Sequence, residues 1–478
     1  MKQSVLMIAT LLFGVLTGLG LTVAQTESSR AQTTPSTEPN ILFVLTDDMR
    51  ASDLRYMPET SNIMAGGGVK FTKAFVTTSL CCPSRATILR GQYAHNHQIL
   101  SNRLPLGGFD KFRSLGRENS TIATWLDDAG YDTMLIGKYF NGYDNTTYVP
   151  PGWDEWHGYL GDYVPSDTYR INENGQISTY ERSQIHDTDL FANKAASFLR
   201  STAGGAPFFM YLSTNAPHTP AFAAQRHQDM FSDVPLPNPP SFNEADVSDK
   251  PAWMRNTPRL TSEEVGKLRN RFRQRLRSLQ SVDEMVGRLV GVLEETGELS
   301  NTYVVFTSDN GLHLGEHRIN TKKWTAYEEA IHVPLLVRGP GVPPGASRSQ
   351  MVLNNDLAPT FASWARVTPP SFVDGRSLSP LFSTNPPSWR SALLVEHWQD
   401  VNGDPYAATI PDYKAVRTGR YLFARYATGE KELYDLSNDP YELKSLHKTA
   451  PTELKRSLAS RLDALESCAA QSCRSAEN

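Results

Sequence analysis

Short apolar runs recur along the chain. Asn40–Leu45 (NILFVL) is apolar at nearly every position, which is typical of a strand buried on both faces of a sheet. Four later runs have the same character: Thr133–Ile136, Phe208–Leu212, Tyr303–Thr307 and Val333–Val337. The pattern predicts that these segments form the buried strands of one sheet.

Stretches with helical periodicity lie between these runs. Thr121–Gly130 places alanine and leucine side chains on one helical face. A longer helix is predicted to begin at a capping box, Thr261 and Glu264, to continue through the apolar positions of Leu268–Leu293 and to end at Gly297. Strands that alternate with helices predict an α/β fold with a large, mainly parallel (mixed) sheet sandwiched by helices. Ligand sites in such sheets lie beyond the carboxyl ends of the strands.

The pattern changes near residue 385, after a stretch rich in proline and serine. Two shorter strand-like segments, Lys414–Arg417 and Tyr421–Tyr426, precede a final helix near Thr452–Cys468. We therefore predict a large domain over residues 40–384 and a smaller α+β domain over residues 385–478.

The N-terminus has the pattern of an export signal. Residues 1–24 carry one charge, Lys2, and an apolar run that ends in small residues suited to cleavage. We predict a cleaved signal peptide over 1–24 and, over 25–39, a disordered leader rich in Ser, Thr, Gln and Pro. A retained membrane anchor is the alternative, but glycines inside the run and the cleavable end favour removal. No later segment approaches a membrane span, so we expect a secreted or periplasmic protein.

Charge and cysteine usage narrow the function classes. The 478 residues include 47 Lys+Arg and 51 Asp+Glu, and the net charge of -4 argues against a nucleic-acid binder, which usually carries a basic excess. Four cysteines are too few for a disulfide-built scaffold. Export permits disulfides, and we predict that Cys468 pairs with Cys473. Cys81 and Cys82 are adjacent, and adjacent cysteines rarely pair because the peptide between them must distort.

Acidic residues directly follow two of the predicted strands. Asp47 and Asp48 come after the first strand, and Asp309 and Asn310 after the strand that begins at Tyr303. Three carboxylates in one pocket would repel each other unless a cation lay between them. Oxygen ligands suit a hard cation, Ca²⁺ or Mg²⁺. The alternative is that these residues only begin turns or cap helices.

The segment from Cys81 to Gly91 (CCPSRATILRG) is predicted to open a helix, with Pro83 in its first turn and a glycine at its end. Backbone N–H groups at the start of a helix favour an anion beside Cys81. Arg85 adds a forked cation suited to a tetrahedral oxyanion. A cation site, a helix N-terminus and an arginine together indicate a site for sulfate or phosphate esters.

This motif, Cys81-x-Pro83-Ser84-Arg85-x-x-x-Leu89-x-Gly91, is similar to the signature of the type I sulfatases of the alkaline phosphatase superfamily. In that family the first cysteine is oxidised to formylglycine by a separate maturation enzyme that reads the Cys-x-Pro-x-Arg core. The resemblance implies the alkaline phosphatase-like fold, with residues 40–384 as the catalytic domain. The residue before the glycine is usually threonine and is arginine here, outside the core.

The acidic residues match the family as well. Asp47-Asp48 and Asp309-Asn310 resemble the two halves of its metal site, to which the modified Cys81 also contributes. The resemblance therefore implies a bound Ca²⁺, with Mg²⁺ as the alternative, and no other cofactor besides formylglycine.

Three basic side chains complete the resemblance. Lys138 lies in a Gly-Lys-Tyr-Phe-Asn-Gly-Tyr segment, in which Phe140 replaces the histidine of many sulfatases; this segment resembles the glucosamine-6-sulfatase and heparan endosulfatase branch. His218 lies in an Ala-Pro-His-Thr-Pro segment that resembles the family's histidine motif. Lys323 has the family's spacing to the tyrosine that follows, and this spacing alone favours it over Lys322.

The family mechanism assigns a role to each residue. The hydrate of formylglycine attacks sulfur through one hydroxyl, and loss of a proton from the second then expels sulfate. Arg85 and the metal hold the hydrate, and Asp309 is the candidate base for the attacking hydroxyl. Lys138 and Lys323 neutralise charge on the sulfate oxygens, and His218 protonates the leaving alcohol. The implied substrate is a sulfated carbohydrate or an aryl sulfate.

Other interpretations stay open at this point. A phosphate or phosphonate monoester hydrolase of the same superfamily would need a similar pocket, and a non-catalytic sulfated-glycan-binding relative or a structural metal-binding protein would keep part of it. The aromatic-rich segments Tyr139–Tyr148 and Trp153–Tyr163 either stack on sugar rings or pack in the core. Four histidines near the motifs are assigned no role, because oxygen sites do not need them; they are His95, His97, His313 and His317.

Overall fold

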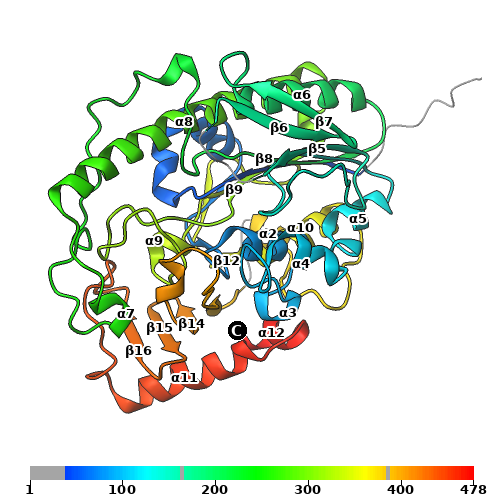
Figure 1. Cartoon of the computed structure of the whole chain (residues 1–478). Coiled ribbons are helices and arrows are strands. Elements are labelled where there is room, and N and C mark those ends of the chain that lie inside the picture. The colour runs from blue at the N-terminus through cyan, green and yellow to red at the C-terminus, as the bar shows by residue number, and fades with distance from the viewer. Residues whose placement is uncertain (1–37, 162–165, 384–387) are drawn as a thin grey trace, which may run out of the picture. The chain divides into compact units, whose positions relative to one another are not determined.

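The structure is a computed structural model that describes residues 38–161, 166–383 and 388–478 (Figure 1). The predicted signal peptide and nearly all of the predicted leader lie outside these residues. Within the described ranges, no helix is both long and apolar enough to cross a membrane.

A ten-stranded mixed sheet forms the centre of the fold. Its strands lie in the order β11 (Ala346–Arg348), β2 (Val69–Phe71), β10 (Leu335–Arg338), β9 (Thr302–Ser308), β1 (Asn40–Thr46), β8 (Phe208–Ser213), β4 (Asp132–Gly137), β5 (Glu155–Leu160), β6 (Thr168–Glu173) and β7 (Gln176–Glu181). The five strands from β9 to β5 are parallel to one another, whereas β10, β6 and β7 run antiparallel to their neighbours. The predicted central strands are confirmed, and Val333–Val337 corresponds to the antiparallel β10.

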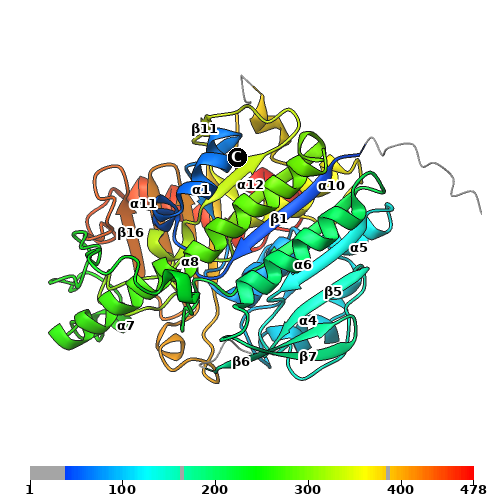
Figure 2. The same ribbon diagram turned by 90° about the horizontal axis from the view of Figure 1, so that it is seen from above.

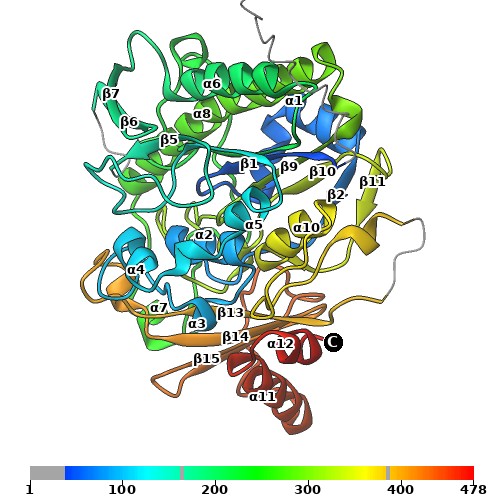
Figure 3. The same ribbon diagram turned by 90° about the vertical axis from the view of Figure 1, so that its right-hand side faces the viewer.

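Helices cover both faces of this sheet. α6 (Asp187–Thr202) and α8 (Ser262–Glu295) lie along one face, and α2 (Cys81–Arg90), α5 (Ile122–Asp127) and α10 (Leu357–Trp364) lie on the other (Figures 2 and 3). β1 shows why its sequence is continuously apolar: Leu42 and Val44 enter one core cluster, whereas Phe43 and Leu45 enter the other. This layered arrangement confirms the predicted α/β class.

A four-stranded antiparallel sheet follows near the C-terminus. It consists of β13 (Ala392–His397), β14 (Tyr413–Thr418), β15 (Tyr421–Tyr426) and β16 (Lys431–Asp435). α11 (Thr452–Glu466) packs on this sheet, and α12 (Gln471–Ala476) ends the chain. The predicted Cys468–Cys473 disulfide is confirmed, and Cys81 and Cys82 are unpaired. The domain boundary near residue 385 stays a prediction.

The remaining strands and α-helices are short. They are the strands β3 (Ala74–Phe75) and β12 (Val352–Leu353) and the helices α1 (Pro58–Thr60), α3 (Ala94–His97), α4 (Gly108–Ser114), α7 (Ala252–Arg255) and α9 (Glu328–Ile331).

Candidate active site

Polar residues that follow four neighbouring strands meet at one edge of the large sheet. β9, β1, β8 and β4 are adjacent and parallel, so their carboxyl ends share this edge. The side chains placed there are Asp47 and Asp48 after β1, Asp309 and Asn310 after β9, Lys138 after β4 and, in the loop after β8, His218.

Cys81 is the first residue of α2, and Leu80 before it has the extended backbone of an N-cap position. The buried Cys81 Sγ lies 2.9 Å from Lys323 Nζ and 3.6 Å from Asp47 Oδ1. Burial raises the pKa of the Cys81 thiol to about 11, against the opposing charges of Lys138 and Lys323. An unmodified Cys81 is therefore a protonated thiol and a poor ligand for a hard cation.

Arg85, one turn further along α2, is fully buried and joins three strand ends. Its Nε donates to Asp309 Oδ2 at 2.9 Å, and its Nη1 donates to Ser213 Oγ and to the Lys138 carbonyl oxygen, both at 2.8 Å. Its Nη2 lies 3.8 Å from Asp47 and has no hydrogen-bond partner within the described residues. One N–H group of the guanidinium is thus left for an oxygen bound in the site.

Two lysines lie directly on two of the aspartates. Lys138 Nζ is 2.5 Å from Asp47 Oδ2, and Lys323 Nζ donates to Asp48 Oδ1. Burial alone would raise the pKa of both carboxyls, but the nearby basic side chains hold both values below their usual range. For Asp309, burial and the neighbouring aspartate outweigh the adjacent guanidinium and raise the pKa to about 6. Repulsion among the three aspartates was the reason to expect a cation here. The basic side chains already relieve much of that repulsion.

The acidic residues also fit a metal ion. Ligand atoms of Asp47, Asp48 and His218 lie within 4.8 Å of one another, and so do those of Asp47, Cys81 and Asp309. Asn310 Nδ2 donates to Asp48 Oδ1 at 2.6 Å, whereas Asn310 Oδ1 is buried without a hydrogen-bond partner in the described chain. An unpaired buried acceptor beside carboxylates is a fitting ligand for a cation that prefers oxygen.

The structure places the two adjacent lysines differently. Lys323 is buried against Asp48 and Cys81, whereas Lys322 is half-buried and pairs with Asp404 at 2.6 Å. His218 Nδ1 lies 2.6 Å from the carbonyl oxygen of Thr219, and its Nε2 lies 3.8 Å from Asp48 Oδ2. Burial lowers the pKa of His218.

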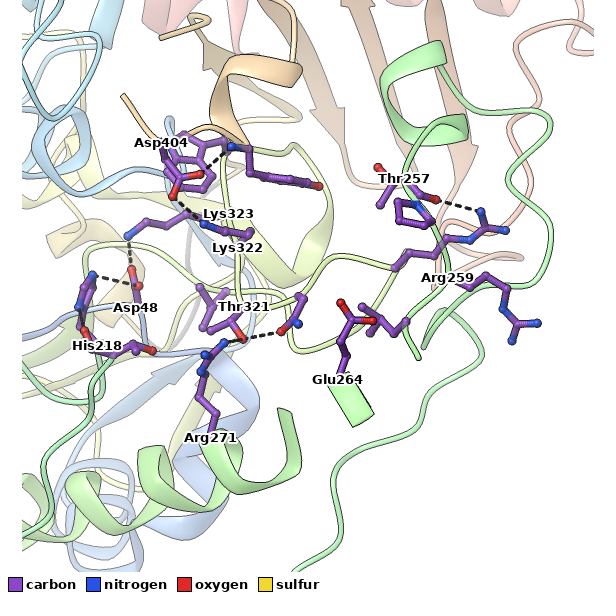
Figure 4. Close-up of a pocket in the computed structure, with 18 residues that line it drawn as sticks. Asp48, His218, Thr257, Arg259, Glu264, Arg271, Thr321, Lys322, Lys323 and Asp404 are labelled. Carbon is purple, nitrogen blue, oxygen red and sulfur yellow. Dashed lines mark hydrogen bonds and ion pairs between the residues drawn. The ribbon is translucent and has the colours of Figure 1, made fainter. Parts of the chain in front are cut away.

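A cavity of about 660 Å³ opens from Asp48, His218 and Lys323 (Figure 4). Its wall carries three arginines that no sequence motif marks, Arg259, Arg271 and Arg318. A second cavity of about 400 Å³ meets the first at His218 and Lys323. These arginines have no characteristic spacing to any motif, so the sequence could not predict that they line the cavity. Ser213 was also missed, although it is the last residue of β8 and the strand-end argument could have found it.

The aromatic segments near the site pack in the core. Tyr139, Tyr143 and Trp156 are almost fully buried and contact one another edge to face. The aromatic side chains that line the large cavity are instead Trp324 and Tyr406, whose ring centroids are 6.4 Å apart. Core packing is therefore the interpretation that these three rings support, whereas Tyr163 lies outside the described residues.

Comparisons with known proteins agree with this geometry. Residues 39–367 match the family described as Sulfatase, and residues 315–468 match the C-terminal region of N-sulphoglucosamine sulphohydrolase. An arylsulfatase of Volvox carteri is 33% identical over 91% of this chain and 75% of its own length. Human N-acetylglucosamine-6-sulfatase is 34% identical over 91% of this chain and 86% of its own.

Two further relatives extend the comparison. A putative extracellular sulfatase of Caenorhabditis elegans, a Sulf-1 homolog, is 36% identical, and the chain spans about half (51%) of its length. A protein solved in complex with its substrate, D-glucosamine-2-N,6-O-disulfate, superposes with a TM-score of 0.76 at 26% identity, over 89% of this chain and 97% of that one. This chain therefore belongs to the sulfatase family, in the branch of its glucosamine-6-sulfatase homologues.

Proposed function

We propose that the enzyme cleaves sulfate esters with a formylglycine made from Cys81 by a separate maturation enzyme, and with a Ca²⁺ or Mg²⁺ ion held by Asp47, Asp48, Asp309 and Asn310. The observation that carries the proposal is the position of Cys81 at the start of α2, in contact with an aspartate and a lysine of the site. A thiol has no evident use among oxygen ligands, whereas an oxygen-bearing product of its oxidation fits both cation and substrate.

The two absent groups supply the central chemistry. A bound cation lowers the pKa of an oxygen that it holds and neutralises negative charge. A hydrated formylglycine at residue 81 would supply two hydroxyls, one as the nucleophile towards sulfur and one for the later release of sulfate, so that one ester and one water would give one alcohol and one sulfate. Asp309 accepts the first proton in this proposal.

The chain's own basic residues bind and orient the sulfate. In this proposal, the unpaired Nη2 of Arg85 donates to an oxygen of the modified residue 81. Lys138 and Lys323 exchange their aspartate partners for the sulfate oxygens, which need the same N–H donors. The Thr219 carbonyl oxygen accepts from His218 Nδ1–H, and in the imidazolium form the Nε2–H is left to give a proton to the leaving alcohol oxygen.

The proposed substrate is a sulfated sugar, and a sulfated amino sugar is the first candidate. An aryl sulfate is the simplest alternative. The support is the similarity to proteins whose names specify glucosamine sulfates. The cavity beyond His218 is large enough for a sugar ring and carries arginines for further anionic groups. The extracellular relative also supports export of this protein, which we propose to be secreted or periplasmic.

The nucleophile is tested on the secreted protein. Mass spectrometry of the peptide with residue 81 should find the aldehyde, and Cys81→Ala should fold yet release no sulfate. Cys82→Ala is the matched control, because Cys82 is buried in the same turn and its Sγ contacts Asn141 rather than the site. Active protein that contains only unmodified Cys81, or turnover by Cys81→Ala, would refute the proposal.

Substrate and cation are tested together. A panel of sulfated mono- and oligosaccharides, with aryl sulfate and aryl phosphate, should show the highest kcat/KM on a sulfated sugar. Chelation should abolish sulfate release, and Ca²⁺ or Mg²⁺ should restore it. Preference for aryl phosphate would favour a phosphomonoesterase, and glycan binding without turnover would favour a binding protein.

A further inference from the structure

A second group of buried ionisable side chains lies beside the loop that carries Lys323. His317 belongs to this loop and Glu329 to α9, whereas Glu442 follows β16 and Glu244 lies in the irregular segment before α7. Ligand atoms of His317, Glu329 and Glu442 lie within 4.8 Å of one another. Three separate parts of the chain therefore converge on one point.

Atoms at this point lack hydrogen-bond partners. His317 Nε2, Glu329 Oε2 and Glu442 Oε1 are all buried and unpaired within the described residues. His317 is 0% exposed and Glu442 is 1% exposed. Each unpaired buried polar atom costs about 1–3 kcal/mol, so three together indicate a missing group that would contact all of them.

The orientation of His317 is already fixed. Its Nδ1 lies 2.7 Å from Glu244 Oε2, so the Nδ1–H donates to that carboxylate. The lone pair of the imidazole then remains on Nε2, which lies 4.0 Å from Glu329 Oε2. A histidine held by a carboxylate at one nitrogen, with the other nitrogen free, is the usual arrangement of a metal ligand.

The charge at the cluster is not balanced by basic side chains. Lys250 Nζ lies 3.7 Å from Glu244 but donates to the Glu442 carbonyl oxygen and to Tyr434. Among the described residues, no lysine or arginine forms an ion pair with the carboxylates of Glu329 or Glu442.

We propose that His317, Glu329 and Glu442 bind a second divalent cation of the class of Zn²⁺ or Mn²⁺, with Glu244 orienting the histidine. One imidazole nitrogen with two carboxylates suits these metals better than Ca²⁺, which takes oxygen ligands alone. Ligand atoms around tetrahedral zinc lie about 3.4 Å apart, as follows from bonds of about 2.1 Å. The present spacings therefore close by small side-chain rotations.

The position of this site indicates a positioning role rather than a chemical one. His317 and Glu329 lie on either side of Lys323 in the sequence, and the His317 ring stacks on Tyr327 at 4.3 Å between centroids. Glu442 belongs to the segment after the small C-terminal sheet. A cation bound here ties both ends of the Lys323 loop to that segment.

The proposal is tested by counting metal. The full chain is stripped with a chelator, reloaded with Zn²⁺, desalted and analysed for zinc per chain. Wild type and His227→Gln should hold one equivalent more than His317→Gln and Glu329→Gln. His227 is the matched control because it forms another histidine–glutamate pair, 2.8 Å from Glu284. The test compares the zinc content of wild type with that of the variants rather than using an absolute count, because Asp47, Cys81 and Asp309 could also bind zinc.

Two readouts separate this site from the catalytic one. Zinc should raise the Tm of stripped wild type and of Cys81→Ala by more than it raises the Tm of stripped Glu329→Gln. Zinc-soaked crystals should give an anomalous peak beside His317 Nε2, a measurement that needs no variant. Equal zinc content in wild type and in a folded Glu329→Gln variant, or no anomalous peak, would overturn the second site and leave the sulfatase mechanism untouched.

Discussion

Arg85 joins the ends of three strands through its hydrogen bonds. Its guanidinium is fully buried and donates to Asp309, Ser213 and the Lys138 carbonyl oxygen. Lysine has one donor group in place of this planar fork, so Arg85→Lys leaves at least one buried acceptor unpaired. We expect a loss of about 3–5 kcal/mol in the free energy of unfolding and a fall of about 10²-fold or more in kcat.

Urea unfolding and sulfate release measure these two effects. Arg456→Lys is the control, because Arg456 is exposed and pairs with Glu453, three residues away in α11. That variant should stay within about 0.5 kcal/mol of wild type. An Arg85→Lys enzyme with wild-type stability and turnover would show that the fork is dispensable.

The neighbouring lysines Lys322 and Lys323 form a natural matched pair. Lys323 contacts Cys81 Sγ and Asp48, and its replacement by alanine removes one donor to the sulfate. We expect kcat/KM of Lys323→Ala to fall about 10²–10³-fold, the usual effect of losing one preorganised donor. Lys322→Ala loses a partly exposed pair with Asp404 and should change kcat/KM by less than about fivefold. Steady-state kinetics of both variants test this expectation. Equal losses of kcat/KM would contradict the assignment of Lys323 as the donor to the sulfate.

At the scale of elements, the end of β4 determines where Lys138 lies. Gly137 has φ +97°, and a Cβ there would lie 1.8 Å from the carbonyl oxygen of Ser213 in β8. Gly137→Ala must therefore push the two strands apart and move Lys138 off the site. We expect kcat/KM to fall by at least about tenfold and stability by about 3 kcal/mol or more.

Gly130→Ala separates backbone strain from the clash. Gly130 also has a positive φ, +84°, but a Cβ there meets nothing within 4 Å. Its replacement should cost only about 1–2 kcal/mol and leave kcat/KM unchanged. Similar kinetic losses in both variants, measured alongside urea unfolding, would show that the position of Lys138 does not depend on the strand contact.

The elements differ in how far the sequence predicted them. Buried strands such as β1 and the capped helix α8 were predicted because an apolar run or a capping box is local in sequence. The strand β7 was missed because its residues are mostly exposed or half-buried at the sheet edge, and no alternation marks it. α6 was missed although it has an apolar face, since its N-cap is His186, whose side chain accepts from Thr188.

The same distinction holds within the site. Motif residues such as Asp47 and Cys81 could be found from spacing and from their place at strand or helix ends. The contacts that organise them join distant positions, as when Arg85 donates to Ser213, and no local pattern encodes such a pair. The arginines of the large cavity come from three places, so only the fold shows that they face the same cavity. Arg259 lies in an irregular segment, Arg271 in α8 and Arg318 in the loop that carries Lys323.

At the scale of the molecule, the small C-terminal sheet is joined to the helices beside the active site by a buried carboxylate. Glu396 in β13 lies 2.9 Å from His95 Nδ1 in α3 and 2.7 Å from Lys414 Nζ in β14. Its backbone N–H also donates to the Thr77 carbonyl oxygen, ahead of α2. The charge on Glu396 therefore stabilises the packing of the C-terminal sheet against the helices near Cys81.

Acid should weaken this junction in a defined pH range. Burial alone would raise the pKa of Glu396, but Lys414 and His95 outweigh burial and lower it to about 2 from an ordinary 4.5. A lowered folded-state pKa gives stability that is present above about pH 4.5 and is lost as pH falls towards 2. Glu396→Gln should therefore cost about 3 kcal/mol at pH 7 and about half that at pH 3. Urea unfolding at pH 7 and at pH 3 measures this loss of stability, with Glu294→Gln at an exposed position as the control. An equal loss at both pH values would mean that packing, rather than charge, holds the sheet in place.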